Sequence, residues 1–335
     1  WLFDQSLEIP TSVTGVKVNT FVRPAGHCLE SLEVTVTDPS LLEGIQASDF
    51  ALKGQASKWM DPSLHDFTAT ISDVSVEGSV FTLTITDFTE KYFYVDNFTV
   101  TCAKNPALSF TSDLITEVVT PTADDFEQVR ISDGAAFDYN IYIPENIDEP
   151  LPVVMAFHGF GDTDNLLQNQ VAVSWAFPEN QAKRPAIVIA PVIERYTDAG
   201  YRDNVYTETY NLIEDLAGRG KADPDRIYVV GKSYGGLATY EFTEKYADNI
   251  AGAIALCGAT TDTIVADAAK MADVPLYIVQ AEHDDTVDVS SSYEMYNALV
   301  ESGSTKVKLK IYSDEEMNEA GVDGTIIGYH TVEMA

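Results

Sequence analysis

The chain has 335 residues, of which 53 are acidic and 20 are basic, giving a formal net charge of −33. Nucleic acids and anionic membranes bind through clustered lysine and arginine, so this charge argues against both as partners. No stretch approaches the roughly 18 uninterrupted apolar residues that a membrane-spanning helix requires. With 45% apolar residues and a length typical of two domains, we expect a globular protein with substantial cores.

The first third of the chain has the alternation of β-strands. Segments such as "GVKVNTFV", "LEVTVTD", "FTATISDVSV", "VFTLTITD" and "YFYVDNFTVTC" alternate apolar and polar residues and are separated by Pro, Gly, Asp and Ser. About seven short strands in roughly 110 residues are typical of an immunoglobulin-like sandwich, although the Cys and Trp spacing of antibodies is absent. We therefore predict a small all-β domain over residues 1–122. A disulfide between Cys28 and Cys102 would suit a secreted domain, and two buried thiols fit the sequence nearly as well.

After a short linker at 118–125, the pattern changes to that of an α/β protein. Apolar runs occur in "PVVMAFHG", "AIVIAPV", "RIYVVG", "AGAIALCG" and "PLYIVQAEHD", and helix-like segments alternate with them, as at 204–218 and 235–247. Continuous apolar strands that alternate with helices predict a mostly parallel sheet covered by helices on both faces. Residues 123–335 are therefore expected to form an α/β domain that binds its ligand at the carboxyl ends of the strands.

A possible nucleophile stands between a predicted strand and a predicted helix. The segment "RIYVVGKSYGGLATYEF" contains Gly231, Ser233 and Gly235 in the G-x-S-x-G pattern of a nucleophile elbow. In this tight turn the serine hydroxyl is pushed out above the sheet. The residues two before and two after the serine must be nearly without side chains. Ser233 is therefore the predicted nucleophile.

A serine hydroxyl needs a base to remove its proton, and in this kind of site the chain order is serine, acid, histidine. Only His283 and His330 follow Ser233. The loop after "PLYIVQAEH" offers Asp284, our choice because a D-x-x-V sequence lets the valine anchor the loop, with Asp285 as the alternative. His283 would point away from its neighbour Asp284 in an extended segment. We therefore predict His330 as the base.

The oxyanion of a tetrahedral intermediate needs preorganised N–H donors. We expect one to be the backbone N–H of Tyr234, directly after the nucleophile. The other is expected in the loop that follows the strand "VVMAF", from Phe160, with Gly161 as the alternative. His158 in the same loop is expected to brace it by hydrogen bonding and not to transfer protons.

These motifs together resemble a known family. From "FDYNIYIP" through "FHGFGD", "WAFPENQAKRPAIVIAPV", "DPDRIYVVGKSYGG" and "VQAEHDDTV" to "GYH", the chain resembles α/β-hydrolase esterases described as predicted peptidases, polyhydroxybutyrate-depolymerase-like or feruloyl-esterase-like proteins. Some of these carry an immunoglobulin-like domain ahead of the hydrolase. The resemblance covers about 210 residues. It implies an α/β-hydrolase fold, a triad of Ser233, Asp284 and His330, and a secreted or cell-surface serine esterase acting on small acyl or aryl esters.

Further residues are candidates for substrate contacts. Lys232 stands where the family usually has a small or polar residue, and we expect it either to meet an acidic or carbohydrate group or to be solvated. Trp175 in "VAVSWAFPENQ" and the tyrosines at 196, 201 and 206 lie in segments that could wall an acyl or aryl group; a structural tryptophan is the alternative. No large insertion precedes the strand of the elbow, so we expect an open site without a lipase-type lid.

The predicted function is that of a serine carboxylesterase that works through an acyl-enzyme and needs no metal or organic cofactor. Feruloyl or acetyl esters of plant polysaccharide are the expected substrates, with polyesters second. A serine peptidase or acyltransferase is less favoured, because no propeller or large cap would select peptides. In a different class, the chain would be a carbohydrate-binding protein with a vestigial hydrolase.

Two questions concern the first domain and the chain ends. The sequence leaves the role of the β-domain open between polysaccharide binding, a homo-oligomer contact and shading of the active site. His330 is followed only by "TVEMA", whereas this fold normally continues with a closing helix. Because "WLFDQS" is typical of the end of such a helix, we hypothesise that residues 1–6 dock on a hydrolase domain of this chain or of a neighbouring copy. An unrelated N-terminal strand is the alternative.

Overall fold

The computed structural model describes residues 11–23, 26–58, 61–88, 97–145, 148–162, 166–322, 329–330 and 332. The chain divides into two compact units, Trp1–Pro121 and Thr122–Ala335, where we expected a boundary after residue 122. Each unit has its own hydrophobic core. No helix in the described ranges is long and apolar enough to cross a membrane. The hypothesis that residues 1–6 dock on a hydrolase domain lies outside the described residues.

The first unit is built from β-strands, and the predicted N-terminal β-domain is confirmed. Its strands are β1 (Val13–Arg23), β2 (Gly26–Val36), β3 (Phe50–Lys58), β4 (Asp61–Glu77), β5 (Val80–Phe88), β6 (Asn97–Cys102), β7 (Phe110–Thr111) and β8 (Ile115–Val119). They are hydrogen-bonded in the order β7-β6-β3-β4-β5-β2-β1-β8, and β1 and β8 pair in parallel whereas the other neighbours are antiparallel. The described strands thus form one continuous hydrogen-bonded order.

The core of this unit comes from the alternating positions that the sequence pattern marked. Val16 and Val18 in β1 are fully buried, and between them Lys17 lies partly exposed. Phe81 in β5 is fully buried and stacks on Phe50 with ring centroids 5.5 Å apart. Alternate residues of a strand point to opposite faces, so one face of each strand supplies the core.

The cysteines form no disulfide. Cys28 lies in β2 and Cys102 lies buried in β6, and β3, β4 and β5 separate these two strands in the hydrogen-bonded order. Of the two arrangements left open by the sequence, the structure has the one without a bridge.

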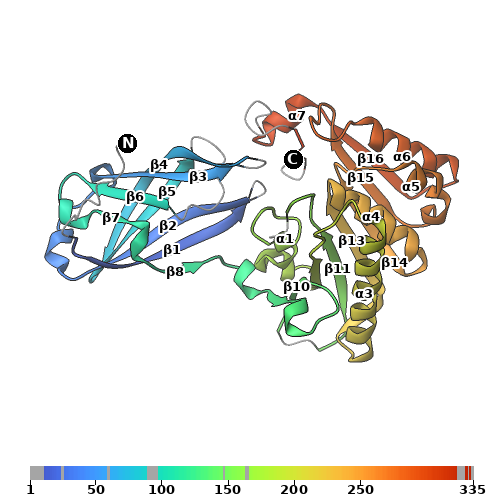
Figure 1. Cartoon of the computed structure of the whole chain (residues 1–335), viewed down its shortest axis with the longest axis horizontal. Coiled ribbons are helices and arrows are strands. Elements are labelled where there is room, and N and C mark those ends of the chain that lie inside the picture. Colours follow the sequence, from blue (N-terminus) through green and yellow to red (C-terminus); the bar gives the residue numbers. More distant parts are fainter. Residues whose placement is uncertain are drawn as a thin grey trace. The chain divides into compact units, whose positions relative to one another are not determined.

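The second unit is an α/β unit, and the predicted mixed α/β fold is confirmed. Its strands are β9 (Glu127–Val129), β10 (Tyr139–Tyr142), β11 (Leu151–Phe157), β12 (Ile187–Pro191), β13 (Ala222–Lys232), β14 (Ile250–Leu256), β15 (Leu276–Ala281) and β16 (Val307–Tyr312). They follow the order β16-β15-β14-β13-β11-β12-β10-β9, side by side in Figure 1. The pairs from β16 to β12 are parallel, and β10 pairs antiparallel with β12 and β9.

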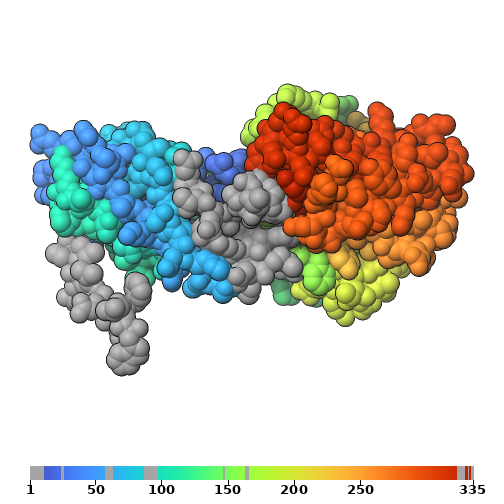
Figure 2. Space-filling view, turned by 90° about the horizontal axis from the view of Figure 1, so that it is seen from above, coloured from blue at the N-terminus to red at the C-terminus, as the bar shows by residue number. Residues whose placement is uncertain are grey.

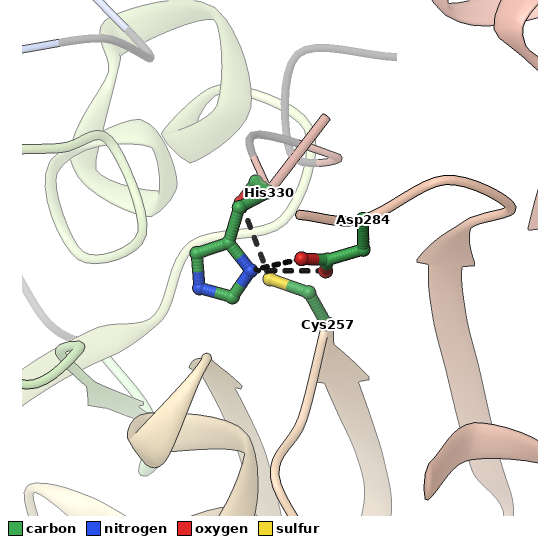
Figure 3. A group of neighbouring side chains, drawn as sticks. All are labelled: Cys257, Asp284 and His330. Carbon is green, nitrogen blue, oxygen red and sulfur yellow. Dashed lines mark hydrogen bonds and ion pairs between the residues drawn. The ribbon is translucent and has the colours of Figure 1, made fainter. Parts of the chain in front are cut away.

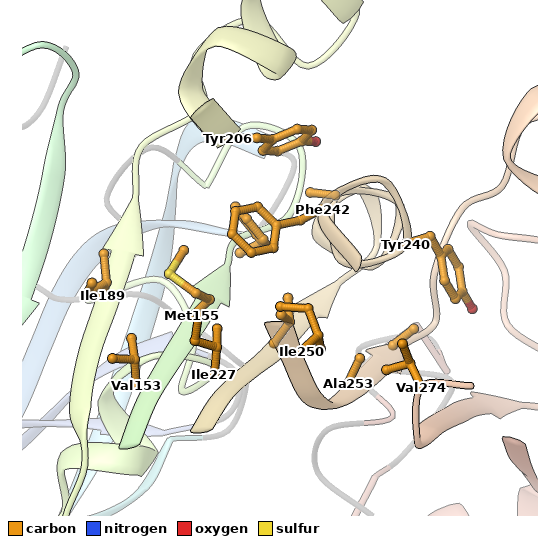
Figure 4. Packing of buried hydrophobic residues seen from close by; sticks show 14 of the residues in the cluster. Val153, Met155, Ile189, Tyr206, Ile227, Tyr240, Phe242, Ile250, Ala253 and Val274 are labelled. Carbon is orange, nitrogen blue, oxygen red and sulfur yellow. The ribbon is translucent and has the colours of Figure 1, made fainter. Parts of the chain in front are cut away.

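The longer helices pack on one face of this sheet. The α-helices are α1 (Val173–Ala176), α2 (Pro178–Gln181), α3 (Ala199–Gly218), α4 (Tyr234–Lys245), α5 (Asp262–Ala266), α6 (Ser290–Glu301) and α7 (Asp314–Glu319). Figure 4 shows Tyr206 of α3 and Phe242 of α4 above Met155 of β11, and all three side chains are at most 2% exposed. Burial of such side chains stabilises the unit by about 1.5–3 kcal/mol each.

The opposite face of the sheet is hollowed. A cavity of about 1380 Å³ lies over it, lined by Val154, Val230 and Ile254 among others. Tyr228 and Tyr277 on this face are 41% and 38% exposed. The sequence predicted helices over both faces, because buried parallel strands are apolar throughout. In the part of the chain that the structure describes, the helices α3, α4 and α6 pack on one face only, and the expected double cover is not found across the other.

A small apolar core on one side of the second unit surrounds the part of the chain near His330. The residues that follow β14, orange and red in Figure 2, gather on one side of the second unit. Cys257, Val279, Met317 and Val332 form a small core there, each at most 6% exposed. This core holds the segment of the chain that carries His330.

Candidate active site

The backbone of Ser233 has the strained conformation of a nucleophile elbow. Its φ is 59° and its ψ −122°, and it is one of three described non-glycine residues with positive φ. Such a conformation costs of the order of 1–3 kcal/mol and persists only where neighbours enforce it. Here the N–H of Ser233 donates to the carbonyl of Leu256 (2.9 Å), and its carbonyl accepts from Ala259 (3.2 Å). The serine is 8% exposed, between β13 and the first turn of α4.

Glycines around the serine allow neighbouring backbone segments to approach closely. A Cβ on Gly231 would lie 2.0 Å from the carbonyl oxygen of Gly235, and a Cβ on Gly235 would lie 2.2 Å from that of Phe157. A Cβ on Gly236 would lie 2.4 Å from the Cα of Gly258. All these contacts are with backbone, which cannot move aside as a flexible side chain can. Direct backbone contact therefore requires glycine at the elbow, as the sequence pattern predicted.

The loop after β11 turns tightly beside the serine. The N–H of Asp162 donates to the carbonyl of Gly159 (3.2 Å), and Gly161 between them has a φ of +82°. This is the geometry of a type II turn, which favours glycine at its third position. A Cβ on Gly159 would lie 3.5 Å from the Cβ of Ser233, so the turn borders the nucleophile. Phe160 at its tip is 54% exposed, and its ring lies 5.4 Å from that of Tyr234, centroid to centroid.

His158 braces this loop, as the sequence predicted. Its Nδ1 lies 2.7 Å from the carbonyl oxygen of Gly159, and its Nε2 accepts from the N–H of Ile193 (2.8 Å). The ring is 1% exposed. Burial lowers the pKa of His158 to about 4, because the charged form loses its water, although the bond to Gly159 opposes this. A neutral imidazole that donates from Nδ1 and accepts at Nε2 fits both contacts.

The structure brings His330 to Asp284. Nδ1 of His330 lies 2.9 Å from each carboxylate oxygen of Asp284, and the two side chains are 1% and 0% exposed. Figure 3 shows that the second ring nitrogen lies on the side away from the carboxylate. A carboxylate can only accept, so Nδ1 carries the proton and Nε2 is left with a lone pair. The imidazole is therefore held in the tautomer that a base requires.

The carboxylate of Asp284 is held on every side. Its Oδ1 accepts from the N–H groups of Thr286 and Val287, both at 2.9 Å, and its Oδ2 accepts from the amide of Gln280 (3.1 Å). Burial by itself raises the pKa of Asp284, but the bond from His330 and the two backbone bonds outweigh it, so the pKa lies below its usual value. The acid is therefore ionised when His330 is neutral.

Two residues that support this pair were missed by the sequence argument. Gln280, fully buried in β15, also donates to the carbonyl of Val287 (2.6 Å) and accepts from the hydroxyl of Ser292 (2.5 Å). Cys257, also fully buried, donates its thiol to the carbonyl of His330 (3.4 Å). A polar residue within the apolar run "LYIVQA" was a signal for the first. Nothing in the sequence pairs Cys257 with a residue 73 positions later.

Cys257 also links the histidine to the elbow. It follows Leu256 and precedes Ala259, the two residues that hydrogen-bond the backbone of Ser233. Its own backbone is strained, with a φ of +40°, and its N–H donates to the carbonyl of Val279 (2.7 Å). The turn at the end of β14 thus contacts both the predicted nucleophile and the segment that carries the predicted base.

The alternatives for acid and base lie elsewhere. Asp285 is exposed, and its carboxylate accepts from the hydroxyl of Thr286 (3.2 Å). His283 is exposed and pairs with Asp314 (2.9 Å), and this bond raises the pKa of His283. His283 is therefore paired with another carboxylate, and it lies in a turn and not in the extended segment that the sequence prediction assumed.

The residues chosen for substrate contacts differ in their burial. Lys232 is 5% exposed at the end of β13, so of its two expected states the solvated side chain is the one that is not found. Trp175 of α1 is half-buried and lines the cavity over the open sheet face. Tyr196 and Tyr206 are 1% and 2% exposed in the core, where their hydroxyls donate to the carbonyl of His158 and to Glu241. These two tyrosines therefore support the fold and do not wall an acyl group.

The comparisons with known proteins agree with this chemistry. Residues 165–316 match the model of the Dienelactone hydrolase family. The match lies within the second unit and includes the elbow and Asp284. The second unit thus has a mixed α/β fold, and residues 165–316 of it are similar to a family of hydrolases.

Two relatives extend the comparison. The bifunctional acetylxylan esterase/xylanase XynS20E of Neocallimastix patriciarum is 23% identical over 172 residues, which are 50% of this chain and 24% of that protein. The chain thus spans about a quarter of the length of this curated relative. The crystal structure of a thermostable esterase is 22% identical, covers 96% of each chain and has a TM-score of 0.73. At this identity the likeness shows the fold, and it extends over both units.

The close backbone contact at the elbow makes Gly235 intolerant of a side chain. We expect Gly235→Ala to lower the free energy of unfolding of the second unit by more than about 2 kcal/mol, because the new methyl group meets the carbonyls of Phe157 and His158. The rate of p-nitrophenyl acetate hydrolysis should fall at least about tenfold, because the elbow must shift. Chemical denaturation and initial rates measure the two effects. Gly218→Ala is the control: nothing lies within 4 Å of its Cβ, and a stable, active Gly235→Ala protein would contradict the argument.

The lowered pKa of His158 predicts a dependence of stability on pH. Unfolded histidine titrates near 6.5, about 2.5 pH units above the folded group, so the unfolded state gains a proton first as the pH falls. The free energy of unfolding should decrease between about pH 6.5 and 4 by roughly 3 kcal/mol from this residue. Urea titrations of wild type and His158→Gln across this range measure the difference. His283→Gln should keep the wild-type slope there, since the pKa of His283 is raised; equal slopes in wild type and His158→Gln would refute the prediction.

Proposed function

We propose that the second unit is a serine esterase whose triad is Ser233, His330 and Asp284. The observation that carries the proposal is the buried bond between His330 and Asp284, which joins residues 46 positions apart; the strained backbone of Ser233 supports it. Both oxygens of Asp284 are already hydrogen-bonded by Gln280 and the loop backbone. A bond to His330 is therefore not needed to satisfy the buried carboxylate, and this favours a role in orienting the histidine.

The chemistry follows from the tautomer. Nε2 of His330 accepts the proton of Ser233 while the hydroxyl oxygen attacks the ester carbonyl, and the imidazolium that forms is stabilised by Asp284. His330 then gives its proton to the leaving alcohol. A water molecule repeats the sequence on the acyl-enzyme and releases the acid. In these steps His330 transfers the protons, and backbone N–H groups near Ser233 stabilise the oxyanion.

For the oxyanion we propose the backbone N–H groups of Tyr234 and Phe160. The N–H of Tyr234 is at the first position of α4, where helix N–H groups have no partner within the helix and the dipole favours negative charge. The turn that contains Phe160 and Gly161 borders Ser233, which supports a second donor from this loop, with Gly161 as the alternative. Lys232 and Trp175 remain proposed substrate contacts.

Substitution of the triad tests the proposal. Ser233→Ala should lower kcat for p-nitrophenyl acetate by at least about 10³-fold, and Asp284→Asn should lower it by roughly 10⁴-fold because the amide favours the wrong tautomer of His330. The KM values should change little. Initial rates over a range of substrate concentrations measure both constants. Ser233→Ala with more than a few per cent of wild-type activity would overturn the triad.

Two controls sharpen this test. Asp285→Asn changes an exposed neighbour of Asp284 and should keep a near wild-type rate. A fluorophosphonate should label wild type on the peptide that contains Ser233 and should leave Ser233→Ala unlabelled. An unlabelled wild type would instead support a carbohydrate-binding protein with a vestigial hydrolase.

As substrate we propose acetyl or feruloyl esters of plant polysaccharide, with acetyl esters first. The support is the name of the similar protein from Neocallimastix patriciarum, a bifunctional acetylxylan esterase/xylanase. The value of kcat/KM for acetate release from acetylated xylan should exceed that for ferulate release from methyl ferulate by at least about tenfold. The initial rate of acetate release should also exceed the rate of monomer release from a polyester film. Chromatography of the released acids measures all three. Preferential release from the film would favour a polyester hydrolase.

For the first unit we propose an immunoglobulin-like module on a secreted or cell-surface enzyme. An all-β unit that precedes an ester hydrolase supports this, as does the likeness of both units to a thermostable esterase. Polysaccharide binding and a homo-oligomer contact are the roles we propose for it.

A further inference from the structure

We propose that Cys257, Asp284 and His330 form an inhibitory site for a thiophilic divalent cation such as Zn²⁺. The sulfur of Cys257, a carboxylate oxygen of Asp284 and a ring nitrogen of His330 lie within 4.8 Å of one another. Figure 3 shows the thiol beside the pair that the aspartate and the imidazole form. The inhibitory consequence, though not the binding, rests on the proposed function of His330.

The donor set matches a known coordination chemistry. Zn²⁺ prefers thiolate, imidazole and carboxylate ligands in a tetrahedral arrangement, and three protein ligands with one water are typical of sites that keep an open position. Hard cations such as Mg²⁺ and Ca²⁺ prefer all-oxygen sites, which this cluster does not offer. The cluster therefore selects a soft or borderline cation.

The positions of the three ligands are set by the fold before any cation binds. Asp284 is held by the backbone of Thr286 and Val287, and Cys257 is held in a positive-φ conformation by its bond to Val279. Only short side-chain movements are needed to bring the three atoms around one ion, because each is already within 4.8 Å of the others. Preorganised ligands of this kind lower the cost of binding.

Binding would block the base through its tautomer. The cation takes the lone pair of Nδ1 in His330, so the proton that Nδ1 shares with Asp284 in their hydrogen bond moves to Nε2. The thiol of Cys257 loses its proton to solvent, so one proton leaves for each cation bound. Nε2 then bears a proton and cannot accept another from Ser233. The cation therefore inhibits without touching the serine.

The cluster is buried: Cys257 and His330 are at most 1% exposed, and Cys257 packs against Leu256, Val279 and Val332. A cation must therefore displace packed apolar side chains to reach the three ligands. We therefore expect slow onset of inhibition, on a timescale longer than mixing.

Cadmium provides a readout that does not depend on activity. A cadmium–thiolate bond has a charge-transfer band in the ultraviolet, whereas Cd²⁺ on surface carboxylates has none. Titration of the wild type in thiol-free buffer should give this band with one Cd²⁺ per chain. Ser233→Ala should give the same band, so binding is measured even if the proposed triad is wrong. Zn²⁺ should inhibit p-nitrophenyl acetate hydrolysis, and EDTA should restore the rate.

Cysteine variants decide the assignment. In Cys257→Ser and Cys257→Ala the band should disappear, and the Zn²⁺ concentration for half inhibition, relative to the metal-free rate of each variant, should rise of the order of 100-fold. Cys102→Ser, in the other unit, is the matched control and should behave as wild type. Thermal unfolding shows that each variant is folded.

Three outcomes would overturn the proposal. The band persists in folded Cys257 variants, the Cys102→Ser protein loses it, or Mg²⁺ inhibits as strongly as Zn²⁺. A band that depends on Cys257 without any inhibition would confirm the binding site but overturn the inhibition and point to a base other than His330.

Discussion

The contact of backbone on backbone at the elbow is the constraint on which the second unit depends. Strand β11, strand β13 and helix α4 approach so closely at Gly231 and Gly235 that no Cβ fits between them. This contact holds Ser233 in a conformation that a free chain avoids, and it places the turn after β11 against the serine. The packing of helices on the sheet supplies the energy that this strain requires.

A second constraint acts at the end of the chain. An ionised carboxylate is costly to bury unless its oxygens are bonded, and Asp284 meets this condition through Gln280, its own loop and His330. The histidine in turn is held by Asp284, by the thiol of Cys257 and by a small apolar core. This explains how a residue five positions from the end of the sequence can be almost fully buried.

Some elements could not be predicted because their sequence pattern is broken. Strand β3 was missed, since its sequence "FALKGQASK" carries two lysines and a glycine where a strand usually has β-branched residues. The glycine, Gly54, is required by contact with the Phe67 ring and the carbonyl of Asn97, which no local pattern reveals. The tyrosines at 196 and 206 were interpreted as walls of a pocket because burial of an aromatic residue depends on the helices packed around it.

The sequence by itself determined the two-part organisation, the alternation of strands and helices in the second part, the elbow serine and the order of acid and histidine after it. These features depend on neighbours a few positions apart, where periodicity and glycine spacing are visible. Only the tertiary structure decided that Asp284 and not its neighbour Asp285 meets His330, that Gln280 and Cys257 support them, and that one sheet face is hollowed. Those contacts join residues far apart in the chain, and their energy depends on burial and distance, which exist only once the chain has folded.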